Sequence, residues 1–422
     1  MATHSLGGRA LATPLVNERA PAGLWKLRLF CGWTILLAAL VGLFALSWDI
    51  QWHTAVGRDR TLTAPHLFIL GSATLMGLTA LVAVLLETRW ARQSRAVAQN
   101  GTRFASFFSS SLGIYLVGYG ALDAAIGFPI DQYWHTLYGV DVTIWAPFHI
   151  MLLSGFCICC LGVAFVLAEG ASLATQQGLH RVARTGSISV IVAFATLMGM
   201  LSILLPQALS TGYISHRSLT FTVYPFMLGI MGMLVLNAAK RALPGLPVAT
   251  CIALIYAFFG LISFLLIPPL MTWLLSVEQQ SLLPGAQTVA VLAVSWQYPL
   301  IIAAVLLDGI TWLAQRRAWT ARKTKWMTFG GAALGITLAA YFYPLFINSQ
   351  LLRTALGHSL VYSVKPVNVA SGAVGRLNPG AVPLNAGVVP ILVVSLLLGV
   401  LGTALGLWLG ANLGDIMGRK EQ

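Results

Sequence analysis

Long apolar stretches dominate this chain and restrict it to one class of fold. Runs long enough to cross a bilayer as a helix, about 20 residues, recur roughly ten times, and the mean hydropathy is +0.82. Only 9% of the residues are charged, whereas a soluble domain carries about 25%. The runs do not alternate as the strands of a membrane barrel do, so helices must satisfy the backbone hydrogen bonds. We therefore predict an all-α, polytopic membrane helical bundle of about ten transmembrane helices with duplicated helical hairpins.

The expected spans divide the chain into five regions. The spans are 27–47, 66–86, 104–127, 144–168, 185–206, 219–239, 247–274, 287–314, 326–347 and 389–412. The regions are a cytoplasmic N-terminal segment (1–26), a duplicated metal-site region (27–170), additional transmembrane helices (171–347), an outward-facing loop (348–388), and the last transmembrane helix with a cytoplasmic tail (389–422).

Basic residues indicate how the chain lies across the bilayer. Most of the 25 Lys and Arg residues fall before the first apolar run, in the even-numbered connections or after the last run. Because positively charged connections stay on the cytoplasmic side, we predict that both termini are cytoplasmic and that the odd-numbered connections face the periplasm of a bacterial inner membrane. The net charge of +13 then reflects topology and contact with anionic lipids. The predicted partner is the lipid bilayer, not nucleic acid.

The first apolar run and the cysteines support two further expectations. The first run has full length and no evident cleavage site, so we expect it to remain as the first helix and not to be a signal peptide. All five cysteines lie inside apolar runs, where we expect small buried packing residues and no disulfides. They are Cys31, Cys157, Cys159, Cys160 and Cys251.

A polar motif occurs twice, in the first and third connections between apolar runs. Residues 47–72 and 129–154 align without a gap and share an Asp, a Trp-His-Thr string, a Gly, a second Asp and an Ala-Pro pair. Each copy has a further His after its proline, so four of the eight His lie in the two copies. An apolar membrane protein has little reason to gather such residues unless they bind a ligand.

The first copy contains the donor groups of a transition-metal site. Asp49 and His53 are four residues apart, which places them on one face if the first helix extends through both. A polar stretch then allows the chain to reverse, and Pro65 starts the next helix with His66 in its first turn. Two imidazoles and a carboxylate suit copper, zinc, iron or nickel, whereas calcium and magnesium prefer oxygen ligands.

The second copy supplies Asp131, His135 and His149. Its last His lies one position further from the proline than in the first copy, a shift of about 100° on a helix. We therefore expect the two sites to differ in geometry. Asp59 and Asp141, in the turns of the two copies, are candidate further ligands or partners that orient an imidazole. Asp59 could instead pair with a neighbouring Arg.

At these residues the chain resembles the C subunit of the copper membrane monooxygenases, the particulate methane and ammonia monooxygenases. Residues 52–66, WHTAVGRDRTLTAPH, are similar to that subunit's W-H-x4-R-D-x3-T-P-x-H segment. The family's D-x3-H-x12-H pattern falls on the Asp and two His of the first copy. Its N-x3-H-x13-H pattern falls on the second copy, with Asp131 where the family has Asn. The resemblance covers 25–170.

The resemblance implies copper at both places and oxygen activation toward a small apolar or ammonia-like substrate. It also implies partner subunits of the monooxygenase type, although the chain has about four more helices than that subunit needs. These helices could form a partner interface or replace a missing subunit, and a homo-oligomer is the alternative to partner subunits. The resemblance alone does not decide whether the chain is an enzyme.

The same residues leave two other functions open. A metal transporter, or a protein that handles metal on the periplasmic side, would use these ligands transiently. A b-type haem or quinone protein would use His66 and His149 as axial ligands, but would leave the Asp-x3-His pairs unexplained.

Two further carboxylates, Asp123 and Asp308, lie within predicted helices. An ionisable group inside a membrane is costly and is therefore a functional candidate. Each could relay protons or pair with a polar neighbour.

Overall fold

The computed structural model of this protein is almost entirely helical in the part of the chain that it describes. The described residues are 22–56, 62–138, 146–211, 213–216, 219–222, 224–245, 247–283, 297–347 and 388–418. The helices are α1 (Ala22–Val56), α2 (Ala64–Gln93), α3 (Arg95–Gln99), α4 (Leu112–Tyr138), α5 (Pro147–Gln176), α6 (His180–Thr211), α7 (Tyr224–Ala242), α8 (Val248–Val277), α9 (Gln297–Arg316), α10 (Ala321–Ile347) and α12 (Val388–Gly418). Two short antiparallel hairpins join β1 (Thr102–Phe104) to β2 (Phe108–Ser110) and β3 (Tyr213–His216) to β4 (Leu219–Thr222). The predicted all-α class is confirmed for this part.

Seven of the described helices are long and apolar enough to cross a bilayer, which supports the predicted membrane protein. They are α1, α2, α4, α5, α6, α8 and the C-terminal part of α12. The helices α7, α9 and α10 overlap three further predicted spans but are not among the seven, so the count of about ten spans stays a prediction. One boundary differs clearly. Helix α4 begins at Leu112 and not near residue 104, because the preceding residues form the β1–β2 hairpin.

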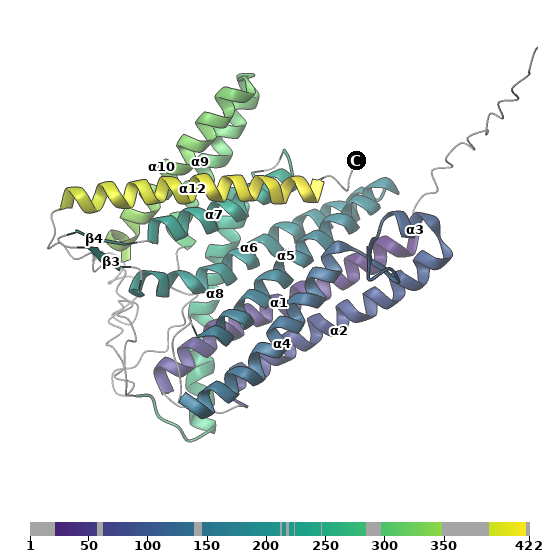
Figure 1. Ribbon diagram of the computed structural model, residues 1–422, viewed down its shortest axis with the longest axis horizontal. Coiled ribbons are helices and arrows are strands. Elements are labelled where there is room, and N and C mark those ends of the chain that lie inside the picture. The colour runs from purple at the N-terminus through teal and green to yellow at the C-terminus, as the bar shows by residue number, and fades with distance from the viewer. Residues whose placement is uncertain are drawn as a thin grey trace, which may run out of the picture.

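Helices α1, α2, α4, α5 and α6 lie side by side as one bundle (Figure 1). Close approach of the backbones positions α4 against α5. A Cβ on Gly120 would meet the carbonyl oxygen of Gly155 and the backbone nitrogen of Cys159, and Gly113 faces Gly162 in the same way. Inside a bilayer no hydrophobic effect drives helices together. Small residues at such crossings let the backbones approach closely, and van der Waals packing then holds the helices in contact.

The bundle has two chemically different ends. At one end, Leu24 of α1 packs with Trp90 of α2, Val97 of α3 and Leu173 of α5. The basic residues of this end include Lys26, Arg89, Arg92, Arg95, Arg103, Arg181 and Arg184. The opposite end holds the C-terminal turns of α1 and α4 and the first turns of α2 and α5. The repeated motifs therefore lie away from this basic end.

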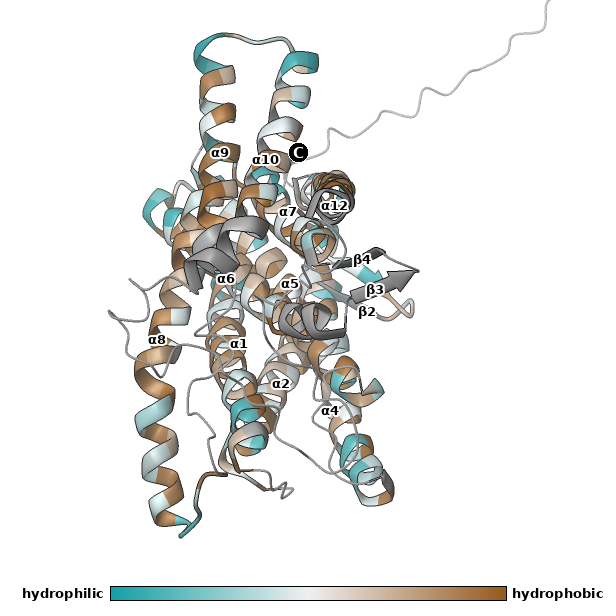
Figure 2. Ribbon diagram, turned by 90° about the vertical axis from the view of Figure 1, so that its left-hand side faces the viewer, coloured by the Kyte–Doolittle hydropathy of each residue, from teal (hydrophilic) through white to brown (hydrophobic). Residues whose placement is uncertain are grey.

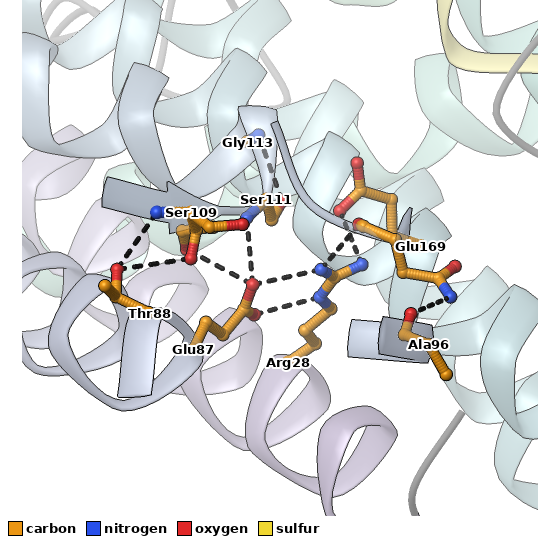
Figure 3. Close-up of polar contacts among 10 residues, drawn as sticks. Arg28, Glu87, Thr88, Ala96, Ser109, Ser111, Gly113 and Glu169 are labelled. Carbon is orange, nitrogen blue, oxygen red and sulfur yellow. Dashed lines mark hydrogen bonds and ion pairs between the residues drawn. The ribbon is translucent and has the colours of Figure 1, made fainter. Parts of the chain in front are cut away.

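A buried ion-pair cluster ties the basic end together (Figure 3). Arg28 donates from Nε to Oε1 of Glu87 at 2.9 Å and from Nη2 to Oε2 at 3.0 Å, while its Nη1 lies 3.1 Å from Glu169 Oε2. The side chains of Arg28 and Glu87 are 2% and 1% exposed. The backbone N–H of Ser111 and the hydroxyl of Ser110 also donate to Glu87. The guanidinium thus joins α1, α2 and α5, and Glu87 adds the strand that leads into α4.

The remaining helices are two packed pairs and α8. Helices α7 and α12 run parallel along a row of glycines, where a Cβ on Gly406 would meet the carbonyl oxygen of Ile230 and one on Gly410 would meet that of Leu234. Helices α9 and α10 form a hairpin whose tip is hydrophilic (Figure 2). Helix α8 reaches from this part to the motif end of α1 (Figure 1).

Asp308 on α9 lies in a clamp that joins three helices. Lys240 Nζ of α7 lies 2.5 Å from Asp308 Oδ1, and the backbone N–H of Thr250 donates to Oδ2 at 2.7 Å. Thr250 is in the first turn of α8, where an N–H lacks an intrahelical partner and a negative charge is favourable. The sequence left open whether Asp308 pairs with a polar neighbour, and the structure places two such neighbours beside it. Its role as a proton relay stays a prediction.

We expect Arg28→Ala to destabilise the protein strongly, because it leaves two buried carboxylates without their guanidinium. Removing one partner of a buried ion pair costs roughly 3–5 kcal/mol. The matched control is Arg241→Ala, which breaks the exposed pair between Arg241 and Asp415 and should cost about 0–1 kcal/mol. The unfolding temperatures of both variants and the wild type in the same detergent measure the difference. Equal shifts would contradict a central role for the Arg28 cluster.

Candidate metal centre

The first group of metal-capable residues begins on α1. The helix continues to Val56, so Asp49 and His53 lie one turn apart on one face, as the spacing predicted. Their side chains meet, with His53 Nε2 at 3.5 Å from Asp49 Oδ2.

Helix α2 brings the third residue of the group. Its N-cap is Thr63, whose side-chain oxygen accepts a hydrogen bond from the backbone N–H of His66 at 3.4 Å. Pro65 occupies the first turn, where a missing N–H costs nothing. The imidazole of His66 turns back toward α1, with Nε2 at 3.1 Å from Asp49 Oδ1. The carboxylate of Asp49 thus contacts an imidazole with each of its oxygens.

The second hairpin repeats this arrangement with α4 and α5. His135 Nε2 lies 3.2 Å from Asp131 Oδ2, and His149 Nε2 lies 3.3 Å from Asp131 Oδ1. The two imidazole rings are 5.7 Å apart between centroids, against 5.5 Å for His53 and His66. We call the two groups the first triad (Asp49, His53, His66) and the second triad (Asp131, His135, His149).

The expected difference in geometry between the two triads is not present, and the reason is a shift in where the helices begin. Helix α2 starts at Ala64, one residue before its proline, whereas α5 starts at Pro147 itself. His66 and His149 are therefore both the third residue of their helices. Because side-chain direction follows position in the helix, the one-residue shift in the sequence is cancelled.

The separations within each triad fit a common metal ion. Two ligand atoms bound at about 2.0–2.1 Å to one ion lie roughly 2.9–3.5 Å apart at square or tetrahedral angles. The carboxylate-to-imidazole separations of 3.1–3.5 Å fall in this range. All ligand atoms of each triad lie within 4.8 Å of one another, and among the described residues these are the two groups of three or more that could hold a metal.

Aromatic and apolar side chains lie beside the first triad. Trp48 and Trp52, which flank Asp49 and are almost fully buried, pack with Met271 and Leu274 of α8. Phe128 of α4 presses its ring edge-on to His66, with centroids 5.4 Å apart. The Phe128 ring covers one side of His66, and the tryptophans pack the turns of α1 that carry Asp49 and His53 against α8.

The other residues singled out in the sequence are not members of either triad. Asp59 and Asp141 lie outside the described residues. Asp123 accepts a hydrogen bond from the Ser154 hydroxyl at 3.1 Å, and its role as a proton relay also stays a prediction. The cysteines are unpaired by disulfides, and the buried Cys159 donates to the carbonyl oxygen of Val117.

Sequence reasoning missed four features, three near the first triad and one at the opposite end of the bundle. Thr63 as the cap of α2 could have been read from its place before an Ala-Pro-His start. The Phe128 contact and the α8 cover could not, since each joins segments that are distant in the sequence. The pairing of Arg28 with Glu87 and Glu169 had a weak signal in two acidic residues at the ends of apolar runs.

We expect Gly155→Ala to destabilise the α4–α5 hairpin that carries the second triad. The added Cβ would lie 2.5 Å from the carbonyl oxygen of Gly120 and 2.8 Å from the backbone nitrogen of Ala124, so the backbones must separate. Gly71→Ala on α2 is the matched control, because its Cβ meets nothing within 4 Å and Ala is the better helix former by about 1 kcal/mol. A lower unfolding temperature for Gly155→Ala alone is the expected result, and no difference would contradict it.

Comparison with known proteins gives no independent identity. No family model, curated protein or solved structure matches the chain. The likeness to the monooxygenase C subunit therefore rests on the residues of the two motifs, and function is argued from the geometry of the two triads.

Proposed function

We propose that this protein is an integral membrane copper-binding protein in which each triad holds one ion. The observation that carries the proposal is the convergence, at one end of two helical hairpins, of a carboxylate and two imidazoles at 3.1–3.5 Å. Burying a carboxylate beside two imidazoles is costly unless the charges are compensated. A divalent ion would compensate the carboxylate and use all three donors.

The donor set favours copper over other metals. Imidazole suits copper, zinc, iron and nickel, and among divalent first-row ions a given nitrogen and oxygen site binds Cu²⁺ most tightly. Zinc and iron remain the alternatives that the same ligands accept. Each triad provides three protein donors, the number found in catalytic zinc sites, where a fourth position takes water or substrate.

The residues at each triad would have different roles in binding the ion. The imidazole Nε2 atoms and the carboxylate would bind the ion, and Thr63, through its bond to the backbone of His66, would hold one imidazole in place. The tryptophans and α8 would exclude water on one side of the first triad. Copper, when bound, would supply the redox chemistry that oxygen activation needs.

We further propose that the chain is a distant relative of the monooxygenase C subunit, acting on a small apolar or ammonia-like substrate. The two motifs support this relationship, and partner subunits or a second copy of the chain would complete the enzyme. The common arrangement of α1 with α2 and of α4 with α5 supports a duplication of the helical hairpin.

The proposed topology has about ten crossings, with both termini cytoplasmic and the triads toward the periplasm of a bacterial inner membrane. Two features support it. The basic residues of the described bundle gather at the end opposite the triads, in agreement with the positive-inside rule. Helices α7 and α12 also run in the same direction. Two helices that cross a membrane in the same direction need an odd number of crossings between them, which agrees with the three expected there.

We expect the purified protein in mild detergent to contain two copper ions per chain. His53→Ala and His135→Ala should each lose about one ion, because a site with two remaining ligands binds copper far more weakly. His180→Ala is the matched control, since His180 is exposed at the start of α6 and distant from both triads. Metal content by mass spectrometry after copper loading measures the result.

Three results would count against the proposal. Absence of bound metal after loading with copper, zinc and iron would mean that the triads are structural His–Asp contacts. Equal copper content in the wild type and both triad variants would place the copper elsewhere. Haem in place of copper would favour the alternative in which His66 and His149 are axial ligands.

A further inference from the structure

The two triads have the same internal geometry but are enclosed to different degrees. His66 in the first triad is 9% exposed, whereas its counterpart His149 in the second is 29% exposed. The carboxylates are alike, at 16% and 18%. For the histidine on the first helix of each hairpin the order is reversed, since the His53 side chain is 15% exposed and that of His135 is 6% exposed. The open edge of the second triad is therefore at His149.

Helix α8 packs on the end of α1 that carries two residues of the first triad. Its residues Ile267, Met271, Leu274 and Leu275 form a buried cluster with Trp48, Trp52, Ala55 and Val56 at the end of α1. The backbone N–H of Leu283, just after α8, donates to the carbonyl oxygen of Ala55 at 2.8 Å. This apolar contact fixes the last turns of α1, on which Asp49 and His53 lie.

The described members of this cluster come from α1, α2 and α8, so the cover does not extend to the second triad. Trp134, the counterpart of Trp52, is partly exposed and packs on Phe148. The neighbouring Tyr133 and Leu137 are largely exposed.

The starts of the second helices differ as well. Thr63 caps α2 with its side chain, but the corresponding Ala146 gives α5 no side-chain cap. Phe128 covers His66 from the neighbouring hairpin. His66 is therefore held by a hydrogen bond to its own backbone and by an aromatic contact, and the second triad has no counterpart of the side-chain cap.

We propose that the second triad is the exchangeable centre, which admits small exogenous ligands and releases its metal readily, while the first triad is a closed centre that retains its metal. This inference rests on the proposed metal function. Its physical basis is that a ligand or chelator must reach the ion, and that supporting contacts around a ligand raise the affinity of a site. Closed sites hold metal for structure, and open sites bind further ligands.

The experiment uses variants that each leave one triad intact. His135→Ala keeps the first triad, and His53→Ala keeps the second. Both are loaded with copper, freed of excess metal and mixed with a membrane-impermeant chelator, and copper release is followed with time. We expect release from His53→Ala to be faster by roughly tenfold or more, the range over which supporting contacts act. The wild-type protein should release its two ions in two phases.

A second measurement probes ligand access without removing metal. Azide, a small anion, should change the electron paramagnetic resonance spectrum of Cu(II) in His53→Ala and leave that of His135→Ala unchanged. Phe128→Ala, added to His135→Ala, should make the first triad sensitive to azide.

The outcomes separate this inference from the proposed function. Copper bound at both triads with equal release rates and equal azide sensitivity would overturn the inference and leave the metal function intact. Slower release from the second triad would overturn it as well. Failure of both variants to bind any copper, with unchanged unfolding temperatures, would instead overturn the metal function.

Discussion

The reversal of two antiparallel helix pairs at one end of the bundle is the constraint on which both triads depend. A helix inside a bilayer must satisfy its own backbone, so polar side chains with a chemical task are least costly near the helix ends. Each hairpin places a carboxylate and an imidazole in the last turns of its first helix. The second imidazole comes from the first turn of the next helix. Close packing of α4 on α5 through glycines keeps this geometry in the second hairpin.

The opposite end of the bundle balances this arrangement with a different kind of polar contact. There Arg28, Glu87 and Glu169 form an almost fully buried network. This network joins four segments, and it specifies their relative positions more closely than apolar contacts alone would. Buried ion pairs are weak sources of net stability but expensive to break. The network therefore acts chiefly on how the helices are placed, and it lies at the other end of the helices that carry the triads.

The two similar hairpins have different surroundings. The shifted position of the last His in the second motif predicted two sites of different geometry, but the distances within the two triads are alike. Their surroundings differ because a helix outside the repeat packs on α1, and because the second copy lacks the capping threonine that the first copy has within the repeat. The additional helices, for which the resemblance offered no role, thus include one that shapes the surroundings of the first triad.

The sequence by itself determined the membrane class, the helical fold and the members of both triads. These are local properties, since a helix-length apolar run, a four-residue spacing and a short turn each constrain only neighbouring residues. Helix positions could be predicted less well near Leu112, where an apolar strand pair resembles the start of a helix. Only the tertiary structure decided that the proline shift is cancelled, that Arg28 joins two distant glutamates and that Lys240 pairs with Asp308. It alone also decided which triad is covered, because such contacts join residues far apart in the chain and depend on how whole helices pack.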